Sequence, residues 1–256
     1  MACMNLEDKT FFILGIANGK SIAAGAARAL RAHGARLAVT YQNEKAKKYV
    51  DPVAEELGAE VYVPCDVTEE GSLEAAVAAA QKTFGTLDGA VHSIAFAPRD
   101  DLHGKVYQTS KDGFALAMDI SCHSFARLAA ATAPLMTNGG SLLTMTYYGS
   151  QKVVDQYGIM GPVKAALESL AMYMACDLGP AGIRVNCISP GPMDTRAASG
   201  IRGFDALMDK AKNKSASGTL VALEDIGNLA AFLSSDAAKA ITGQVHYIDH
   251  GASITD

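Results

Sequence analysis

The chain of 256 residues is 49% hydrophobic, which is enough for a large core, and α/β folds commonly reach this length as one domain. Its 22 Lys and Arg face 27 Asp and Glu without a long basic block, so a nucleic-acid partner is not expected. Residues 1–10 carry charge where a signal peptide needs an apolar run, and no stretch approaches about 18 uncharged apolar residues. We therefore expect a cytoplasmic protein without a membrane segment.

The cysteines are odd in number and widely spaced, and no two of them form a CxxC pair. This pattern indicates reduced thiols rather than disulfides or zinc ligands. The cysteines are Cys3, Cys65, Cys122, Cys176 and Cys187.

Short apolar runs typical of strands alternate along the chain with longer stretches of helical period. Strands are predicted at 11–16, 36–41, 60–65, 89–95, 141–147, 184–190 and 244–250. Helices are predicted at 21–33, 44–57, 69–84, 111–136, 158–179 and 224–235. This alternation predicts an α/β fold, a single-domain, Rossmann-like, doubly wound parallel sheet of about seven strands over residues 1–256. Ligands of such sheets bind beyond the carboxyl ends of the strands, so the residues that follow each strand are the candidates for a site.

The first predicted strand ends in a turn from Gly15 to Ser21 that leads into a helix. Glycine permits a tight turn, and a helix N-terminus offers N–H groups and a positive dipole to a pyrophosphate. The turn departs from the usual GxGxxG pattern, and a strand-to-helix turn without a ligand explains it equally well. Its place at the start of a βα series favours the cofactor interpretation.

The residues after the second strand fit an adenosine ribose. Gln42 and Asn43 can hydrogen-bond the ribose hydroxyls, whereas Lys45, Lys47 and Lys48 are most simply the solvated face of the next helix. NADH is therefore favoured over NADPH.

After the third strand, Asp66 could accept a hydrogen bond from the adenine amino group, while Val67 supplies a backbone contact. Capping of the next helix is the alternative role for Asp66. Small residues after the fourth strand would let a flat ring lie against the backbone, although packing alone also explains them. His92 precedes that loop and is interpreted as a core histidine.

Tyr157 and Lys164 lie seven residues apart, close to two helical turns, so both side chains are predicted to share one helix face. A nearby ammonium would lower the pKa of the phenol and make it a donor to an oxygen that gains negative charge. A half-buried Tyr and a solvated Lys are the plainer alternative. Pro162 is tolerated only in a first helical turn, so the helix should begin shortly before it, with Tyr157 near the boundary.

Together these motifs resemble the bacterial enoyl-acyl-carrier-protein reductases of the short-chain dehydrogenase/reductase superfamily, nearly from end to end. Ordinary members of the superfamily place Lys four residues after Tyr, where this chain has Gly161, and the Tyr-x6-Lys spacing marks the enoyl reductase branch. His250 stands where the family often has Gly. The matching stretches are Gly15-x5-Ser21-Ile22-Ala23-x-Gly25, Thr40 to Asn43, Cys65-Asp66-Val67, His92 to Pro98, Tyr147-x9-Tyr157-x6-Lys164 and Gly191 to Ile201.

The resemblance implies hydride transfer from NADH to the β-carbon of a trans-2-enoyl thioester, the last step of the fatty-acid elongation cycle, without a metal. It implies that Tyr157 bonds the thioester oxygen, that Lys164 holds the nicotinamide ribose, and that Tyr147 is a second active-site tyrosine. The implied substrate contacts are Ala97, Tyr147 and Tyr157. The implied cofactor contacts are Gly15, Ser21, Ile22, Gln42, Asp66, Val67, Ser93, Ile94, Ala95, Lys164, Met193, Asp194, Thr195, Arg196 and Ala197.

The resemblance also implies an acyl carrier protein as partner and a homotetramer built on the helices at 111–136 and 158–179. Residues 192–217 suit a lid over an apolar acyl chain, with an extra amphipathic surface helix as the alternative. Two other functions stay open. One is a carbonyl or hydroxyl dehydrogenase on the same scaffold, against which Gly161 argues, and the other is a non-catalytic NAD-binding protein.

Overall fold

One parallel sheet of seven strands organises the molecule. The structure, a computed structural model, describes residues 4–193 and 204–255. The strand order is β3-β2-β1-β4-β5-β6-β7, and every neighbouring pair is parallel. All seven predicted strands are confirmed. They are β1 (Thr10–Leu14), β2 (Arg36–Tyr41), β3 (Val61–Pro64), β4 (Gly89–His92), β5 (Gly140–Met145), β6 (Ile183–Pro190) and β7 (Val245–Ile248).

The helices follow the predicted pattern with four differences. The predicted helix at 111–136 is α5, a π-helical turn at Asp119–His123, α6 and a short 3-10 turn at Ala133–Leu135. The helix predicted from residue 69 begins at Ser72, and the short α4 has no counterpart in the prediction. Helix α8 is also absent from the predicted helices, and it lies within the segment 192–217 for which an extra helix was the alternative to a lid. The helices are α1 (Ile22–Ala32), α2 (Glu44–Leu57), α3 (Ser72–Phe84), α4 (Arg99–His103), α5 (Lys111–Met118), α6 (Ser124–Thr132), α7 (Met160–Leu178), α8 (Phe204–Lys214) and α9 (Leu223–Ser234).

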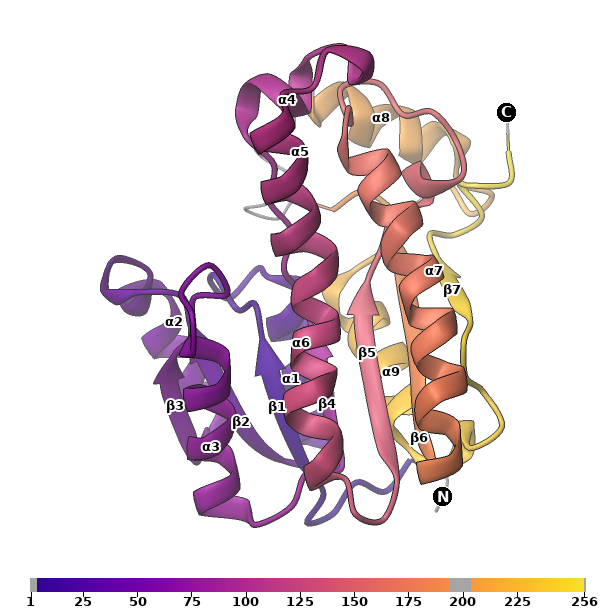
Figure 1. The fold of residues 1–256 in the computed structure, drawn as a ribbon. Coiled ribbons are helices and arrows are strands. Elements are labelled where there is room, and N and C mark those ends of the chain that lie inside the picture. Colours follow the sequence, from indigo (N-terminus) through magenta and orange to yellow (C-terminus); the bar gives the residue numbers. More distant parts are fainter. Residues whose placement is uncertain (1–3, 194–203, 256) are drawn as a thin grey trace.

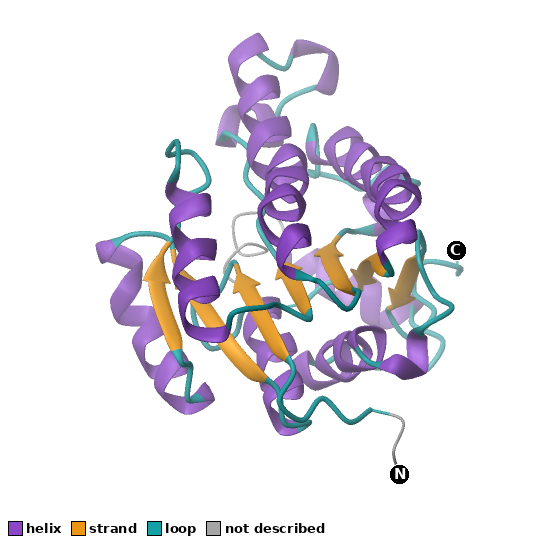
Figure 2. Ribbon diagram, turned by 60° about the horizontal axis from the view of Figure 1, so that its bottom comes forward, coloured by secondary structure: helices purple, strands orange, loops and turns teal. Residues whose placement is uncertain are grey.

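The sheet lies between two layers of helices (Figure 2), so both of its faces are buried. Successive side chains of a strand point to opposite faces, and β1 shows the result. Phe12 and Leu14 belong to the core formed with α3, α6 and α7, whereas Phe11 and Ile13 belong to the core formed with α1 and α9. A strand buried on both faces must be apolar throughout, which is why these strands read as continuous apolar runs.

Strands β1 and β4 are neighbours at the point where the strand order reverses, and their carboxyl ends approach closely there. Gly15 follows β1 with φ of 110°, a left-handed conformation that favours glycine. A Cβ atom at this position would lie 2.2 Å from the carbonyl oxygen of Ser93, the residue after β4. Only glycine therefore permits this contact. Helices α4 and α8 lie beyond the same end of the sheet, at the top of Figure 1.

The turn after β7 shows why the family often has Gly where this chain has His250. It follows β7 with φ of 53°, which is the left-handed region where glycine is most at ease. The Asp249 carboxylate accepts hydrogen bonds from the N–H groups of Gly251 and Ser253, both at 2.9 Å. These bonds hold the turn that places a non-glycine residue in this conformation.

In the part of the chain that the structure describes, no helix is long and apolar enough to cross a bilayer. Among the same residues, no group of three His, Cys, Asp or Glu side chains is arranged to hold a metal ion. Four of the cysteines lie in this part of the chain and are unpaired.

His92, at the end of β4, is fully buried and hydrogen-bonded, as expected for a core histidine. Its Nδ1 lies 3.0 Å from the Thr144 hydroxyl and its Nε2 lies 2.7 Å from the Ser124 hydroxyl. Burial, with a smaller contribution from the charge of Lys164, lowers the pKa of His92 to about 3. The imidazole is therefore neutral in the folded protein at any pH near 7.

We predict that His92 makes the fold sensitive to acid. Between pH 6.5 and about 3 the unfolded chain protonates this imidazole and the folded chain does not, so its contribution to stability falls as pH falls. The loss should be about 1.4 kcal/mol per pH unit in this range. Urea unfolding at pH 7 and at pH 5 checks it. The stability difference between His92→Gln and wild type should shrink on acidification, while the exposed His123→Gln should track wild type at both pH values. An unchanged His92→Gln difference would contradict the prediction.

Candidate active site

A cleft of about 1110 Å³ opens beyond the carboxyl ends of β1 to β4. Both aliphatic and polar side chains line it, as is usual for sites that bind an extended cofactor. Nine of the predicted cofactor contacts lie on its wall, and they come from four different strand ends. They are Gly15, Ser21, Ile22, Gln42, Asp66, Val67, Ser93, Ile94 and Ala95.

The Ser21 side chain, predicted to stand at the start of the helix, holds the turn after β1. The Ser21 hydroxyl accepts hydrogen bonds from the N–H groups of Ala17 and Asn18, each at 3.0 Å. It donates to none of the residues that the structure describes, so its proton is available to a ligand. Helix α1 then begins at Ile22 without an acidic residue in its first turn. The positive end of the helix dipole at the cleft is therefore uncompensated, which suits a phosphate.

Gln42 and Asp66 meet across the ends of β2 and β3. The Gln42 side-chain amide donates to Asp66 Oδ2 at 3.0 Å, and Asp66 Oδ1 accepts from the N–H group and the hydroxyl of Thr68 at 3.0 and 2.7 Å. Burial alone would raise the pKa of Asp66, but the hydrogen bonds from Thr68 and Gln42 lower it below its ordinary value. The corner is anionic, and because the Gln42 side chain donates its NH₂ group to Asp66, its side-chain carbonyl is a further acceptor. Asp66 Oδ1 holds a turn at Thr68, but Asp66 does not cap α3, whose N-cap residue is Gly71, so the alternative interpretation as a helix cap is wrong.

Three tyrosines cluster beyond β5. The Tyr147 ring packs edge-on against Tyr148 and Tyr157, with centroids 4.6 and 5.0 Å away. The Tyr147 hydroxyl is buried, and no described residue hydrogen-bonds to it. A Cβ atom at Gly149 would lie 2.7 Å from the Tyr157 ring, so this glycine makes room for the ring. A buried hydroxyl without a partner is costly, which marks Tyr147 as a group that a ligand could satisfy.

Tyr157 lies ahead of α7 rather than on it. Pro162 is the third residue of α7, as its chemistry requires, and the helix begins at Met160. Tyr157 sits in the preceding turn, between two residues with positive φ, Gln156 at 61° and Gly158 at 45°. The prediction that Tyr157 and Lys164 share one helix face is therefore wrong, and the turn sets their separation instead.

Lys164 is a buried amine with one defined partner. Its side chain is 4% exposed, and Nζ donates to the Met145 carbonyl at the end of β5 at 2.7 Å. Burial lowers the pKa of Lys164 to about 8, against the opposing effects of Cys187, Cys122 and Glu168. The alternative of a solvated lysine is excluded.

The phenol of Tyr157 behaves differently from the sequence-based expectation. Burial, followed by the negative charge of Glu168, raises the pKa of Tyr157, so the predicted lowering by a neighbouring ammonium is wrong. The Lys164 ammonium contacts the Met145 carbonyl, and no positive charge among the described residues lowers the pKa of this phenol. Tyr157 is consequently a hydrogen-bond donor at neutral pH.

Three residues that support the site were absent from the sequence-based prediction. Glu168 is 8% exposed, lies one turn after Lys164 on α7 and accepts from the Thr146 hydroxyl at 2.6 Å. Arg127 of α6 donates to the Val67 carbonyl at 2.7 Å. Ser121 hydrogen-bonds the backbone of Phe96. The position of Glu168 four residues after Lys164 was the one readable signal.

The remaining predicted residues have mixed outcomes. Ala97 is half-buried in the loop after β4, and Met193 is buried, but neither lines the cleft. The predicted contacts Asp194, Thr195, Arg196 and Ala197 lie outside the described residues, as does part of the predicted lid at 192–217.

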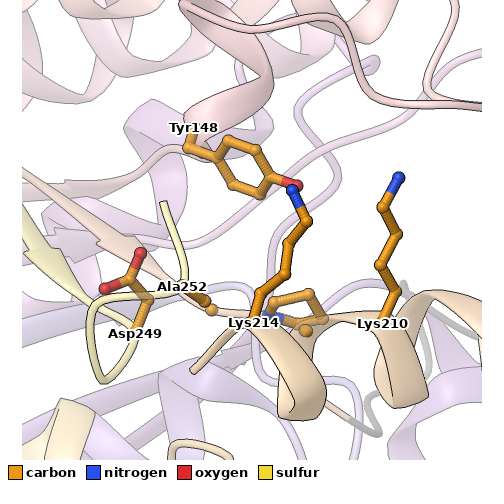
Figure 3. A pocket seen from close by; sticks show the side chains of 8 residues that line it. Tyr148, Lys210, Lys214, Asp249 and Ala252 are labelled. Atoms are coloured by element: carbon orange, nitrogen blue, oxygen red, sulfur yellow. The ribbon is translucent and has the colours of Figure 1, made fainter. Parts of the chain in front are cut away.

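A small pocket adjoins the tyrosine cluster on the side of α8. Lys210 and Lys214 of this helix lie near Tyr148, and the Lys214 side chain extends toward the Tyr148 hydroxyl (Figure 3). Asp249 and Ala252 line the same pocket from the loop after β7. A basic helix face therefore borders the tyrosine cluster.

The fold and the cleft define the class of protein. Dinucleotide-binding α/β proteins share three features with this chain. These are a doubly wound parallel sheet, a helix N-terminus suited to phosphate, and polar side chains near the reversal of strand order that can hydrogen-bond to ribose hydroxyls. Lys164, Tyr147 and Tyr157 do not line the cleft, but they lie at and beyond the carboxyl end of β5, the strand next to β4, and add groups suited to acid chemistry.

Comparison with known proteins identifies the family. A family model described as Enoyl-(Acyl carrier protein) reductase matches residues 15–253. The chain is 45% identical over 246 residues to enoyl-(acyl-carrier-protein) reductase (NADH) 1 of Rhizobium meliloti, which covers 96% of this chain and 90% of that protein. The chain therefore belongs to the enoyl-(acyl carrier protein) reductase family.

Solved structures agree with this assignment. The enoyl-(acyl-carrier-protein) reductase of Anaplasma phagocytophilum in complex with NAD has a TM-score of 0.94 at 43% identity, covering 100% of this chain and 97% of that chain. The Bacillus cereus enzyme with NADP+ and indole naphthyridinone has a TM-score of 0.95 at 40% identity, covering 98% and 99%.

We predict that Lys164 costs stability at neutral pH. Its folded pKa of about 8 lies below the ordinary value of 10.5, so the buried charge destabilises the fold below pH 8, and this penalty disappears as pH rises from 8 to 10.5. Lys164→Met should raise the free energy of unfolding at pH 7 by about 1–2 kcal/mol, after the loss of the Met145 hydrogen bond. Urea unfolding at pH 7 and pH 10 measures this, with the exposed Lys82→Met as control. A Lys164→Met variant less stable than wild type at pH 7 would refute the prediction.

Proposed function

We propose that this protein reduces the double bond of a trans-2-enoyl thioester on acyl carrier protein with NADH, which gives the saturated acyl thioester. The observation that carries the proposal is a cleft lined by nine predicted cofactor contacts, in a member of the enoyl reductase family that also holds Tyr147 against Tyr157 and buries Lys164 at the end of β5. This is the class of reaction named for its relatives from Rhizobium meliloti and Anaplasma phagocytophilum.

The residues of the cleft fit NADH as a set. The N-terminus of α1 and the Ser21 hydroxyl would hold the pyrophosphate, and the corner of Gln42 and Asp66 would hold the adenosine. The loop after β4 would support the nicotinamide, whose ribose would bind Lys164. Bound NADH supplies the hydride, and the protein supplies the orientation and the groups that respond to the charge.

The corner of Gln42 and Asp66 supports NADH over NADPH. A carboxylate and an amide carbonyl accept hydrogen bonds from ribose hydroxyls and repel a 2′-phosphate. Lys45 and Lys48 also line the cleft, but they are exposed residues of α2 and their charges are screened by solvent.

Tyr157 is the group proposed to meet the charge that develops during the reaction. Hydride addition at the β-carbon turns the thioester carbonyl into an enolate, whose oxygen needs a donor. Because burial raises the pKa of Tyr157, the phenol keeps its proton at neutral pH and can donate to this oxygen. The unpartnered Tyr147 hydroxyl is proposed as a second polar contact to the substrate, and Ala97 as a further substrate contact.

The proposed partners are an acyl carrier protein and three further copies of the chain. Lys210 and Lys214 would attract the acidic carrier or the phosphate of its prosthetic group to the pocket of Figure 3. Exposed apolar residues on α5 and α7, namely Phe114, Met172 and Tyr173, support a homotetramer through these helices. We also propose that the segment 192–217 closes over the acyl chain and that the protein works in the cytoplasm.

We expect NADH to be oxidised when a trans-2-enoyl thioester such as crotonyl thioester is added, at a rate at least about tenfold higher than with NADPH. A 3-ketoacyl thioester should give little turnover, which separates double-bond from carbonyl reduction. Absorbance of the reduced nicotinamide follows the reaction. Faster ketoacyl turnover would favour a carbonyl dehydrogenase, and cofactor binding without any turnover would favour a non-catalytic binding protein.

Tyr157→Phe should lower kcat by about 10²–10³, the effect of removing one donor to a developing oxyanion. NADH binding should change by less than about threefold, because the phenol is not assigned to the cofactor. Steady-state kinetics and fluorescence titration of NADH measure the two quantities. Tyr62→Phe on the edge strand β3 is the matched control and should keep wild-type kcat. Wild-type kcat in Tyr157→Phe would remove the assigned role.

A further inference from the structure

The long helix that packs on β4 contains a π-helical turn, Asp119–His123, between α5 and α6. Such turns widen a helix by one residue, are rare and occur often at functional sites. Here the widened turn buries three successive side chains, Ile120, Ser121 and Cys122. Ile120 also lines the cleft, so the π turn lies directly behind the proposed cofactor site.

Ser121 of this turn hydrogen-bonds to the loop that follows β4. Its hydroxyl accepts a hydrogen bond from the N–H group of Phe96 at 2.8 Å and donates one to the carbonyl of the same residue at 3.0 Å. The hydroxyl is fully buried and lies 4.0 Å from the Met160 sulfur, at the first residue of α7. One side chain therefore fixes both polar backbone groups of Phe96, beside the helix that carries Lys164.

This double hydrogen bond sets the direction of the neighbouring peptide groups. One oxygen reaches the N–H and the C=O of a residue only where both point to the same side, as they do in an extended chain. The corresponding groups of the residues before and after then point to the opposite side. Those residues are Ala95 and Ala97, and within the described ranges 4–193 and 204–255 their backbone groups have no hydrogen-bond partner. Ala95 is exposed on the cleft wall.

We infer that Ser121 is a positioning residue. Its hydroxyl makes the two backbone hydrogen bonds that a neighbouring strand would otherwise make on one side of the loop. The peptide groups of Ala95 and Ala97 then face cofactor and substrate on the other side. The inference rests on the proposed function, because it concerns how the same site orients its ligands. The π turn brings the hydroxyl to Phe96, since among the described residues no side chain of α5 or α6 hydrogen-bonds to the Phe96 backbone.

The neighbouring Ser124 provides a matched control. It is also fully buried, and its hydroxyl hydrogen-bonds to the Ile120 carbonyl at 2.6 Å and to His92 at 2.7 Å. Among the described residues it makes no hydrogen bond to the loop 93–98. Ser121→Ala and Ser124→Ala remove the same atom from equally buried positions three residues apart. Ser121→Thr keeps the hydroxyl and tests for rescue.

The experiment measures kcat and KM for crotonyl thioester, the Kd of NADH, and deuterium exchange of the segment 93–98 in all four proteins. Ser121→Ala should lower kcat/KM by about tenfold or more, through a lower kcat and a higher thioester KM, while Ser124→Ala changes it by less than about threefold. The Kd of NADH should change little, because the adenosine half binds elsewhere. Exchange in the segment 93–98 should accelerate about tenfold or more in Ser121→Ala only, and Ser121→Thr should recover most of the turnover.

Equal losses in Ser121→Ala and Ser124→Ala would overturn the inference, because they would reflect general damage to the core. Unchanged deuterium exchange in the segment 93–98 of Ser121→Ala would overturn it even if turnover fell. Absence of turnover in the wild-type protein would instead refute the proposed function. The exchange measurement on Ser121→Ala would still decide whether Ser121 fixes the loop.

Discussion

The hydrogen bond from the Lys164 amine to the Met145 carbonyl joins helix α7 to strand β5, the two elements that border the tyrosine cluster. It connects the first turns of α7 to the carboxyl end of β5, and both partners are buried. A buried amine is stable only with acceptors around it, so β5 must end and turn where its last carbonyl can receive this bond. The position of Tyr147 just after β5, and hence its ring contact with Tyr157, follows from this constraint.

The region between the end of β5 and α7 contains more buried polar side chains than packing requires. Thr146 and Glu168 form a buried pair behind the tyrosines, and the Tyr147 hydroxyl has no partner among the described residues. A sheet covered by Ala-rich helices could close with apolar side chains instead. Polar groups of this kind persist where a ligand completes them. Burial raises the pKa of Tyr157 and lowers that of Lys164, as expected for polar groups held in a site that excludes water.

The sequence predicts the sheet well because its signal is local. Strands buried on both faces must be apolar, and the helix boundaries of α2 at Glu44 and Leu57 follow from an asparagine cap and a closing glycine. The residues that line the cleft are readable for the same reason, since each follows a strand. Ser121 and Arg127 were not readable, because their partners Phe96 and Val67 lie 25 and 60 residues away. A π turn also leaves no periodic signal of its own.

The error about Tyr157 is instructive in physical terms. Seven residues match two helical turns, but the turn at Gly158 takes up part of that length with a left-handed conformation before α7 begins. Tyr157 can therefore approach Tyr147 from a loop while Lys164 reaches β5 from the helix, two directions that one helix face does not provide. A four-residue spacing would place both side chains on the same side of one helix, about one turn apart. The longer spacing thus separates the Tyr157 phenol from the Lys164 amine. The phenol can then donate to an oxygen that lies farther from the amine than a four-residue spacing would allow.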